Sequence, residues 1–395
     1  MRIKPFYLLL CSLFLIISII FSSCTMPSRR KIPEFRVVIT NPLPVARIDL
    51  PIAMKVEDIR KVAPDFTFKA FLVSPLEGGR DLPSQAEDTD GDGKLDTLVF
   101  LIDLEPEARR EVAVRYEPKA PMRLTLGYEK RTFGGVFPEL EGMAWESEKT
   151  VYLMRVDFRS TILFAPKSKE GLVLKDYLGA LLSNGEAKVK LNWIRCGGFG
   201  IWDGQKVHEP FNPASSPEDS VRTFTRVISD GAVRSSVQIV YDNWLIGGKR
   251  IRVSSTLSIS AGRYYTLNAL KIDGGNGLKI AALIPKMGTV VRDKADGLLM
   301  AWDEESRTGA AVIFPAEAFV EFLDSPPIIP RDESENVAVV LAPDVNGDLS
   351  YYLIGREGLN SFDEFESTVK LMAKSIASPP EVKITPKPRR KRRRR

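Results

Sequence analysis

The sequence predicts a mostly β protein in which large antiparallel sheets pack face to face beside a smaller N-terminal β-sandwich. The first observation is a succession of short runs rich in Val, Ile, Leu and Phe, separated by clusters of Pro, Gly, Asp and Ser. The second is alternation, because apolar side chains recur at every second position early in residues 250–259, as in a half-buried strand. The third is that helix patterns are confined to a few segments.

Residues 34–122 have the length and rhythm of a small β-sandwich and form the first predicted domain. Its strands are expected at residues 35–40, 68–73, 96–104 and 110–116. Residues 56–62 are expected to form one short helix.

Residues 123–376 form the second predicted domain, which is also rich in strands and closes with a helix. A hairpin is expected at Asp230-Gly231, because this dipeptide between two apolar runs favours a tight turn. The strands are expected at residues 150–158, 221–229, 233–241, 250–260, 264–272, 277–284, 298–302, 310–314, 337–342 and 350–354. Helices are expected at residues 173–182 and 361–376, with Ser361 as the N-cap of the second.

The N-terminus predicts export and a lipid anchor. Residues 1–23 combine Arg2 and Lys4 with a short apolar run that ends in small residues, which is typical of a signal peptide. Cys24 directly follows, as in a bacterial lipobox, so it is the expected lipidation site, and residues 24–33 are a linker. An uncleaved anchor or an ordinary signal peptide is the alternative. The expected location is the bacterial cell envelope, either periplasmic or on the cell surface.

The charge of the chain is concentrated at its two ends. The net charge is +5, and residues 1–31 and 380–395 supply +5 and +8, which leaves −8 for the rest of the chain. Residues 377–395 are therefore expected to be a disordered basic tail that is attracted to an anionic surface. A solvated terminus without a partner is the alternative, and export argues against nucleic acid.

Cysteine usage leaves Cys196 as the single thiol of the body, which excludes an internal disulfide there. A small residue buried at a tight turn is favoured over a reactive thiol. The chain has no P-loop, dinucleotide fingerprint or nucleophile elbow, so no organic cofactor is expected.

The segment from Asp88 to Asp96 predicts a structural calcium site. Alternating carboxylates followed by glycine can surround a hard cation with oxygen ligands, and the residue after the glycine can offer its carbonyl. The expected ligands are Asp88, Asp90, Asp92, Lys94 and Asp96. An acidic solvated turn is the alternative.

Two segments, residues 131–155 and 195–204, are dense in Arg, Glu, Gly and Trp and are expected to be loops. Three arginines, Arg131, Arg155 and Arg195, suit a uronate carboxylate, because guanidinium groups match carboxylates in geometry. Trp145, Trp202 and Trp244 suit stacking on sugar rings, and Glu139, Glu146 and Asp203 suit hydroxyl binding or proton transfer. Core packing of each Trp and structural ion pairs for each Arg are the alternative.

His208 is the only histidine of the chain, which excludes mechanisms that need two histidines and His-rich zinc sites. Because it follows the Ile-Trp-Asp-Gly turn, it is a candidate acid or base in the same cleft. An exposed loop histidine is the alternative.

The same segments resemble the bacterial family DUF4861. Residues 131–146 contain its expected Arg-Thr start and Ala-Trp-Glu centre, and residues 196–203 contain its Cys-Gly-Gly-x-Gly-Ile-Trp-Asp pattern. A later hairpin ending in Tyr241, Asp242 and Trp244 is also similar, so Tyr241 joins the candidate binding residues. The similarity spans about residues 35–376. Phe133 departs from an expected tyrosine, and the stretch between the two segments is shortened.

The resemblance implies a galactose-mutarotase-like β-supersandwich associated with polysaccharide breakdown. The expected function is an exported, lipid-anchored protein that acts on or binds acidic oligosaccharides. Lyase, epimerase or hydrolase chemistry would use Glu146, Glu139 or His208, with Arg131 as the carboxylate clamp. The alternative is a non-catalytic glycan-binding or structural lipoprotein of the envelope. Both readings require the loops around Trp145 and Trp202 to line one concave surface.

Overall fold

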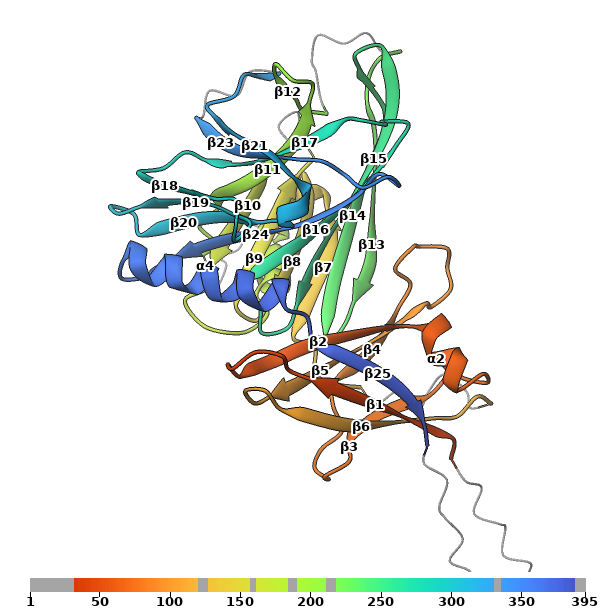
Figure 1. The fold of residues 1–395 in the computed structure, drawn as a ribbon. Coiled ribbons are helices and arrows are strands. Elements are labelled where there is room, and N and C mark those ends of the chain that lie inside the picture. The colour runs from red at the N-terminus through yellow and green to blue at the C-terminus, as the bar shows by residue number, and fades with distance from the viewer. Residues whose placement is uncertain are drawn as a thin grey trace, which may run out of the picture.

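A computed structural model describes residues 32–119, 127–156, 161–183, 190–210, 218–329 and 335–387. Within them a small sandwich of two sheets lies beside a larger body of two sheets and two helices (Figure 1). The proposed signal segment, Cys24 and the last eight residues lie outside the described residues. The mostly β class, the large antiparallel sandwich, the smaller N-terminal sandwich and the C-terminal helix are confirmed.

The N-terminal sandwich packs a sheet of four strands on a sheet of three. The first sheet has the order β25 (Glu381–Pro386), β1 (Glu34–Thr40), β6 (Arg109–Tyr116) and β3 (Phe71–Pro75). The second has the order β2 (Arg47–Lys55), β5 (Thr97–Leu104) and β4 (Ser84–Glu87), and helix α2 (Val56–Val62) follows β2. Alternate residues of β1, such as Val37 and Ile39, are fully buried in the core between the sheets.

The expectation of a disordered tail over residues 377–395 is wrong for the described part of that segment. Residues Glu381–Pro386 form β25, which pairs antiparallel with β1 and places Ile384 opposite Val37. Ile384 packs against the core of the sandwich, and the pairing covers an edge of β1 that would otherwise expose unpaired backbone groups. The like charges that predict disorder lie mostly beyond this strand.

The larger body contains a ten-stranded and an eight-stranded sheet that pack face to face. The ten-stranded sheet follows the order β21 (Phe319–Asp324), β23 (Asn336–Leu341), β17 (Lys279–Pro285), β11 (Ile194–Trp202), β10 (Ile162–Pro166), β9 (Thr150–Arg155), β8 (Gly142–Ser147) and β7 (Thr132–Phe137), with β12 (Val207–His208) and β22 (Ile328–Ile329) off this path. The eight-stranded sheet follows the order β13 (Arg222–Asp230), β14 (Arg234–Ile246), β15 (Lys249–Ser260), β16 (Tyr265–Asp273), β24 (Asp348–Glu357), β20 (Thr308–Ile313), β19 (Leu298–Asp303) and β18 (Thr289–Asp293).

The two segments expected to be loops are largely strands of the ten-stranded sheet. Residues 131–155 contain β7, β8 and β9, and residues 195–202 lie in β11. Their glycines serve close packing more than turning. A Cβ atom on Gly197 would lie 2.9 Å from the Leu283 carbonyl oxygen and 2.9 Å from a methyl group of Leu353. One on Gly200 would lie 2.5 Å from Val207.

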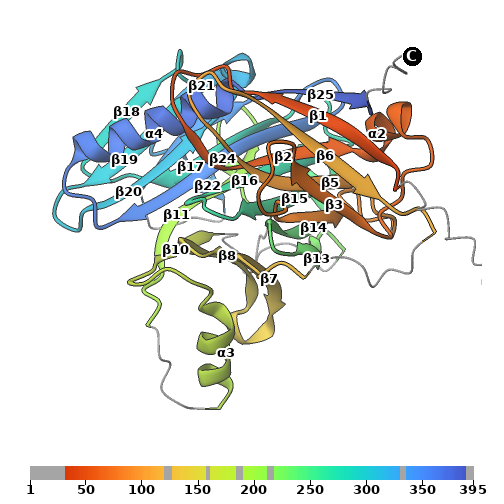
Figure 2. The same ribbon diagram turned by 90° about the horizontal axis from the view of Figure 1, so that it is seen from below.

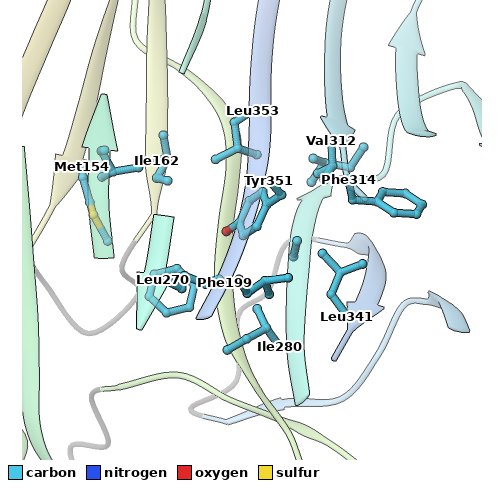
Figure 3. Packing of buried hydrophobic residues seen from close by; sticks show 14 of the residues in the cluster. Met154, Ile162, Phe199, Leu270, Ile280, Val312, Phe314, Leu341, Tyr351 and Leu353 are labelled. Carbon is cyan, nitrogen blue, oxygen red and sulfur yellow. The ribbon is translucent and has the colours of Figure 1, made fainter. Parts of the chain in front are cut away.

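The main core lies between the two sheets. Figure 3 shows part of it, where Phe199 of the ten-stranded sheet lies near Leu270 and Tyr351 of the eight-stranded sheet. All three side chains are at most 3% exposed. The inward faces therefore account for the alternation seen in the sequence.

Two helices cover the outer faces of the body (Figure 2). α3 (Leu174–Leu182) packs on the outer side of β8. The described residues also include two short 3₁₀ helices, η2 (Pro138–Leu140) and η3 (Ala316–Ala318). α4 (Phe362–Ala377) packs on β19 and β20, where Phe365 stacks on Trp302 with ring centroids 5.4 Å apart. Ser361 caps α4, because its side chain accepts a hydrogen bond of 3.3 Å from the amide of Glu364. Among the described residues, no helix combines the length and the apolar character that a membrane span needs.

Candidate functional site

Three aromatic residues expected to bind sugar are core residues instead. Trp145 and Tyr241 are fully buried and Trp244 is 3% exposed. The Trp145 indole stacks on Tyr152 at 5.8 Å and donates a 2.9 Å hydrogen bond to Thr266. Because these rings lie between the sheets, they cannot stack on a ligand in this conformation. Alternation along β8 and β14 turns them inward, and the sequence does not say which side of a strand faces solvent.

Glu146 is also buried, and its contacts are structural. Its carboxylate pairs with the buried ammonium of Lys167. It also accepts amide hydrogen bonds of 2.9 Å from Val173 and 2.9 Å from Leu174, at the start of α3. The Lys167 ammonium group also donates hydrogen bonds to the carbonyl oxygens of Ser147 and Gly171. The expected role of Glu146 as an acid or base is therefore corrected, because its oxygens are committed to holding α3 against the sheet.

Arg131 joins the two domains and does not face an open site. Its guanidinium group forms two hydrogen bonds of 2.7 Å to the Asp49 carboxylate of β2, and it also pairs with Glu148. The hydrogen bonds from Arg131 are the main reason why the pKa of Asp49 is lowered. The other oxygen of Glu148 accepts the amide of Gly262 at 3.0 Å. With both acids engaged, Arg131 acts as an interdomain clamp and not as the expected carboxylate clamp.

The other candidates, Glu139 and Arg155 of the first segment and Arg195 of the second, are spread over the ten-stranded sheet and its connections. Glu139 is exposed on η2, and Arg155 is half-buried at the end of β9. Arg195 is half-buried on β11 opposite Leu163 of β10. β8 is three strands from β11, or roughly 14 Å at the usual strand spacing. Trp145 also lies in the core between the sheets, whereas Trp202 belongs to a separate cluster, so the structure does not bring the two segments together on one surface.

Three predicted residues do meet at the end of β11. His208 of β12 lies 2.6 Å from Asp203, measured from Nε2 to Oδ2, and both side chains are partly exposed. Burial alone would raise the pKa of Asp203, but the hydrogen bonds from His208 and from the amides of Lys206 and Gln205 outweigh it and lower the pKa to about 2. This carboxylate therefore stays ionised beside the imidazole and can support proton transfer by His208.

Trp202 lies beside this pair but offers little surface to a ligand. Its indole N–H donates a 3.1 Å hydrogen bond to Glu321, and the residue is 7% exposed. It packs with Val207 and Ile328 on the outer face of the sheet. A sugar ring stacks on an exposed aromatic face, and the Trp202 ring has little exposed surface. Trp202 therefore packs beside the Asp203–His208 pair and is not suited to stacking on a sugar.

Cys196 is fully buried, and burial raises the pKa of its thiol well above the usual value. It is part of the main core. The thiol is therefore unreactive, as a structural cysteine should be.

The acidic loop brings together three of the five expected calcium ligands. Carboxylate oxygens of Asp88, Asp90 and Asp96 lie within 4.8 Å of one another. Asp92 instead forms a 3.0 Å ion pair with Lys94. The Asp88 carboxylate accepts amide hydrogen bonds from within the loop, including one of 2.8 Å from Gly93. Three clustered carboxylates are oxygen donors of the kind that hard cations prefer. The sequence predicts five protein ligands, so the structure brings together fewer than expected.

A hollow that the sequence reasoning missed lies between α4 and the outer face of the eight-stranded sheet. It has a volume of about 870 Å³ and receives polar groups from α4, from β24, from η3 and from the turn between β18 and β19. These groups belong to Asp296, Glu317, Ser350, Tyr352, Lys370 and Lys374. We call this hollow the α4 groove. Its size lies within the range of pockets that hold small ligands.

Tyr352 is the aromatic residue of the α4 groove with an available hydroxyl. Its ring packs edge-on against Tyr265 at 5.5 Å, and within the described parts of the chain its hydroxyl has no hydrogen-bond partner. Burial raises the pKa of Tyr352, so the phenol remains a donor. On the helix, the i, i+4 spacing of Lys370 and Lys374 was the one sequence signal for the groove, since it places both on one side.

Comparison with known proteins places these features in a family. The family described as a domain of unknown function, DUF4861, matches residues 39–176 and 194–382. The Formosa agariphila protein called "Uncharacterized protein P7" is 23% identical over an alignment of 330 residues, and the match covers 76% of this chain and 80% of that protein.

Solved structures with a similar fold include two from Enterococcus faecalis. An alpha-mannosidase from strain V583 gives a TM-score of 0.50 at 11% identity, covering 89% of this chain and 46% of the other. A protein in the Glycosyl Hydrolase Family 38 gives a TM-score of 0.51 at 11% identity, covering 91% and 48%. This chain thus spans about half the length of either protein, and at such identity the likeness shows the fold alone.

Proposed function

Since the chain belongs to the DUF4861 family, we propose that it is an exported, membrane-tethered protein that binds oligosaccharides. The observation that carries this proposal is the α4 groove, with its exposed donors and acceptors beside a tyrosine ring. The fold is one that carbohydrate-active proteins use, which supports a sugar as the ligand. A similar fold does not by itself identify the ligand, so the proposal rests mainly on the residues of the groove.

The chemistry of the groove suits a hydroxyl-rich ligand. Tyr352 offers a ring edge and a hydroxyl, and Ser350 on the same strand offers a second hydroxyl. Lys374 donates from the helix side, while Asp296 and Glu317 can accept from sugar hydroxyls. Both charge signs line the groove, so it accommodates neutral sugars as well as acidic ones. An apolar peptide would leave these charges without partners.

The tether is supported by the place where the chain ends meet the N-terminal sandwich. β1 begins at Glu34, ten residues after Cys24, and β25 ends at Pro386. The two strands are neighbours (Figure 1). Lys387 pairs with Glu34 at 2.7 Å. The segments that carry Cys24 and the seven basic residues among the last eight therefore join the described structure at paired strands, β1 and β25. An acyl chain and a basic cluster together bind a membrane more stably than either does alone.

Binding is tested with a panel of neutral and acidic oligosaccharides, followed by titration of the best ligand. Tyr352→Ala should weaken binding at least tenfold, and Tyr352→Phe should show how much the hydroxyl contributes. Lys374→Ala should also weaken binding, whereas Lys69→Ala, at an exposed lysine of the N-terminal sandwich, should not. Binding that survives Tyr352→Ala unchanged would remove the groove from the proposal.

Tethering has a separate test in cells and on vesicles. Cys24→Ala should release the protein from membranes. Truncation after Lys387 should reduce binding to anionic vesicles at low salt and have little effect on neutral vesicles. A Cys24→Ala protein that remains fully membrane-bound would contradict lipid anchoring.

Catalysis is the second candidate function, and the Asp203–His208 pair favours it. The 2.6 Å contact orients the imidazole, and both groups reach the surface. On an oligosaccharide that the protein cleaves or epimerises, His208→Gln should abolish turnover while leaving binding in the α4 groove intact. Turnover that is unaffected by His208→Gln assigns the reaction elsewhere, and a bound ligand that never turns over favours a binding protein.

A further inference from the structure

A small polar pocket opens at one rim of the space between the two large sheets. It lies where the ends of β9 and β10 meet the end of β24, and its volume is about 120 Å³. Its charged lining residues are Lys149, Lys167, Glu170, Arg356 and Glu357, and its aromatic ones are Phe164 and Tyr264. We call it the rim pocket. It shares no residue with the α4 groove.

Arg356 is held in the rim pocket with its donors unused. Its guanidinium carbon lies 3.9 Å from the centroid of the Tyr264 ring, which fixes the orientation of the planar group. Its Nε atom is buried without a hydrogen-bond partner. Across the described ranges, the side chain makes no hydrogen bond and no ion pair. A buried donor without a partner is costly, so a ligand that accepts its hydrogen bonds would be recognised strongly.

Two lysines line the same pocket, and Lys149 is the one that adds a donor near Arg356. Lys149 Nζ lies 6.0 Å from the centroid of Tyr264, so it is at most 9.9 Å from the Arg356 guanidinium carbon, the sum of the two distances. The hydrogen bond to Glu170 raises the pKa of Lys149, which keeps it charged. Lys167 at the floor contributes neither net charge nor a free donor, because the Glu146 carboxylate neutralises it and, with two carbonyl oxygens, takes its three N–H groups.

The acidic residues of the pocket define what the rest of the ligand must offer. Glu170 is engaged by Lys149, whereas Glu357 makes no ion pair with any described residue. A simple anion would satisfy Arg356 but would lie near the uncompensated Glu357 carboxylate. A ligand that carries a hydroxyl group close to its carboxylate satisfies both, since the hydroxyl can donate to Glu357.

We propose that the rim pocket binds the carboxylate end of a hydroxylated acid, the chemistry that a uronic acid residue presents. The carboxylate accepts hydrogen bonds from Arg356 and Lys149, and a neighbouring hydroxyl donates to Glu357. A volume of about 120 Å³ equals roughly four water molecules at liquid density, so it admits the charged end and leaves the remaining ring at the mouth. This site does not rest on the α4 groove, and either can fail without the other.

The test is calorimetric titration of the full chain with sodium glucuronate at constant ionic strength, with glucose as the neutral probe. Both ligands are titrated into Tyr352→Ala protein, in which the α4 groove is disabled, and there glucuronate should bind and glucose should not. Arg356→Gln should weaken glucuronate binding about tenfold or more, the effect of losing a charge-assisted pair. The same substitution at the exposed Arg80 should change nothing. Tyr352→Ala, in the α4 groove, should leave unchanged the part of glucuronate binding that depends on Arg356.

Two further variants separate the parts of the proposal. Glu357→Gln should weaken binding of glucuronate but not of acetate, which lacks the hydroxyl. Arg356→Lys keeps the charge and loses the planar fork, so it should weaken binding at least threefold, and it serves as the test if Arg356→Gln does not fold. In the Tyr352→Ala background, glucuronate binding that survives both Arg356 variants, or that glucose matches, overturns the carboxylate site. Sulfate that binds as tightly as glucuronate overturns the assignment to a hydroxylated acid.

Discussion

Replacing Glu146 by alanine should destabilise the protein severely, because the change leaves buried partners unsatisfied. Lys167 would retain its ammonium group at 1% side-chain exposure without a counter-charge. Breaking such a pair costs about 3–5 kcal/mol. The amides of Val173 and Leu174 would also lose their acceptor, at about 1–3 kcal/mol each. These costs are not additive, so we expect a loss of at least about 4 kcal/mol in the free energy of unfolding.

For a body of this size, each kcal/mol lowers the melting temperature by about 2–4 °C, so Glu146→Ala should lower it by at least about 8 °C. Calorimetry of Glu146→Ala, Lys167→Met and the double variant gives the coupling between the two residues. We expect a coupling energy above about 1.5 kcal/mol, because the second substitution removes the charge that the first leaves unpaired. Near-additive losses, or a wild-type melting temperature for Glu146→Ala, would refute the structural role assigned to this pair.

The remaining predictions concern the C-terminal strand, the acidic loop and acid stability. Truncation after Pro380 removes β25 and should lower the melting temperature, whereas truncation after Lys387 should not; equal melting would contradict the pairing of β25 with β1. A calcium chelator should lower the melting temperature of the wild type but not of Asp90→Ala. If the chelator does not change the melting temperature of the wild type, the acidic loop is only a turn. Because the pKa of Asp203 falls from 3.8 to about 2 on folding, this carboxylate stabilises the fold above about pH 4 and loses that contribution as the pH falls toward 2. Urea unfolding of Asp203→Asn should therefore depend less on pH in that window, and an unchanged dependence would show that the pair with His208 contributes nothing.

The sequence predicted helices and many strands because their signals are local. α2 coincides with its expected range, and α4 begins after the predicted cap at Ser361. Asp230-Gly231 joins β13 and β14 as a hairpin, as a turn dipeptide between apolar runs should. These features depend on neighbouring residues, so they survive without knowledge of the rest of the fold.

The candidate site was less predictable because residue type does not reveal which way a side chain points. Trp145 and Glu146 are adjacent, yet Trp145 enters the core between the sheets and Glu146 faces α3. Glycines of β11 suggested turns, but Gly197 instead allows close approach to Leu353. Arg131 finds its partner Asp49 in the other domain, 82 residues away in the chain. No local pattern carries such information.

The sequence by itself determined the β-rich class, the capped C-terminal helix, the family resemblance and the acidic loop. These follow from periodicity, capping chemistry and motif spacing, which act over a few residues. Only the tertiary structure decided that the tryptophans of the motifs are buried, that the C-terminal segment returns to pair with β1, and that Arg356 stands with unused donors beside Tyr264. The reason is physical: burial and pairing depend on which surfaces meet across long distances in the chain, and that choice is made by the packing of the whole sheet system.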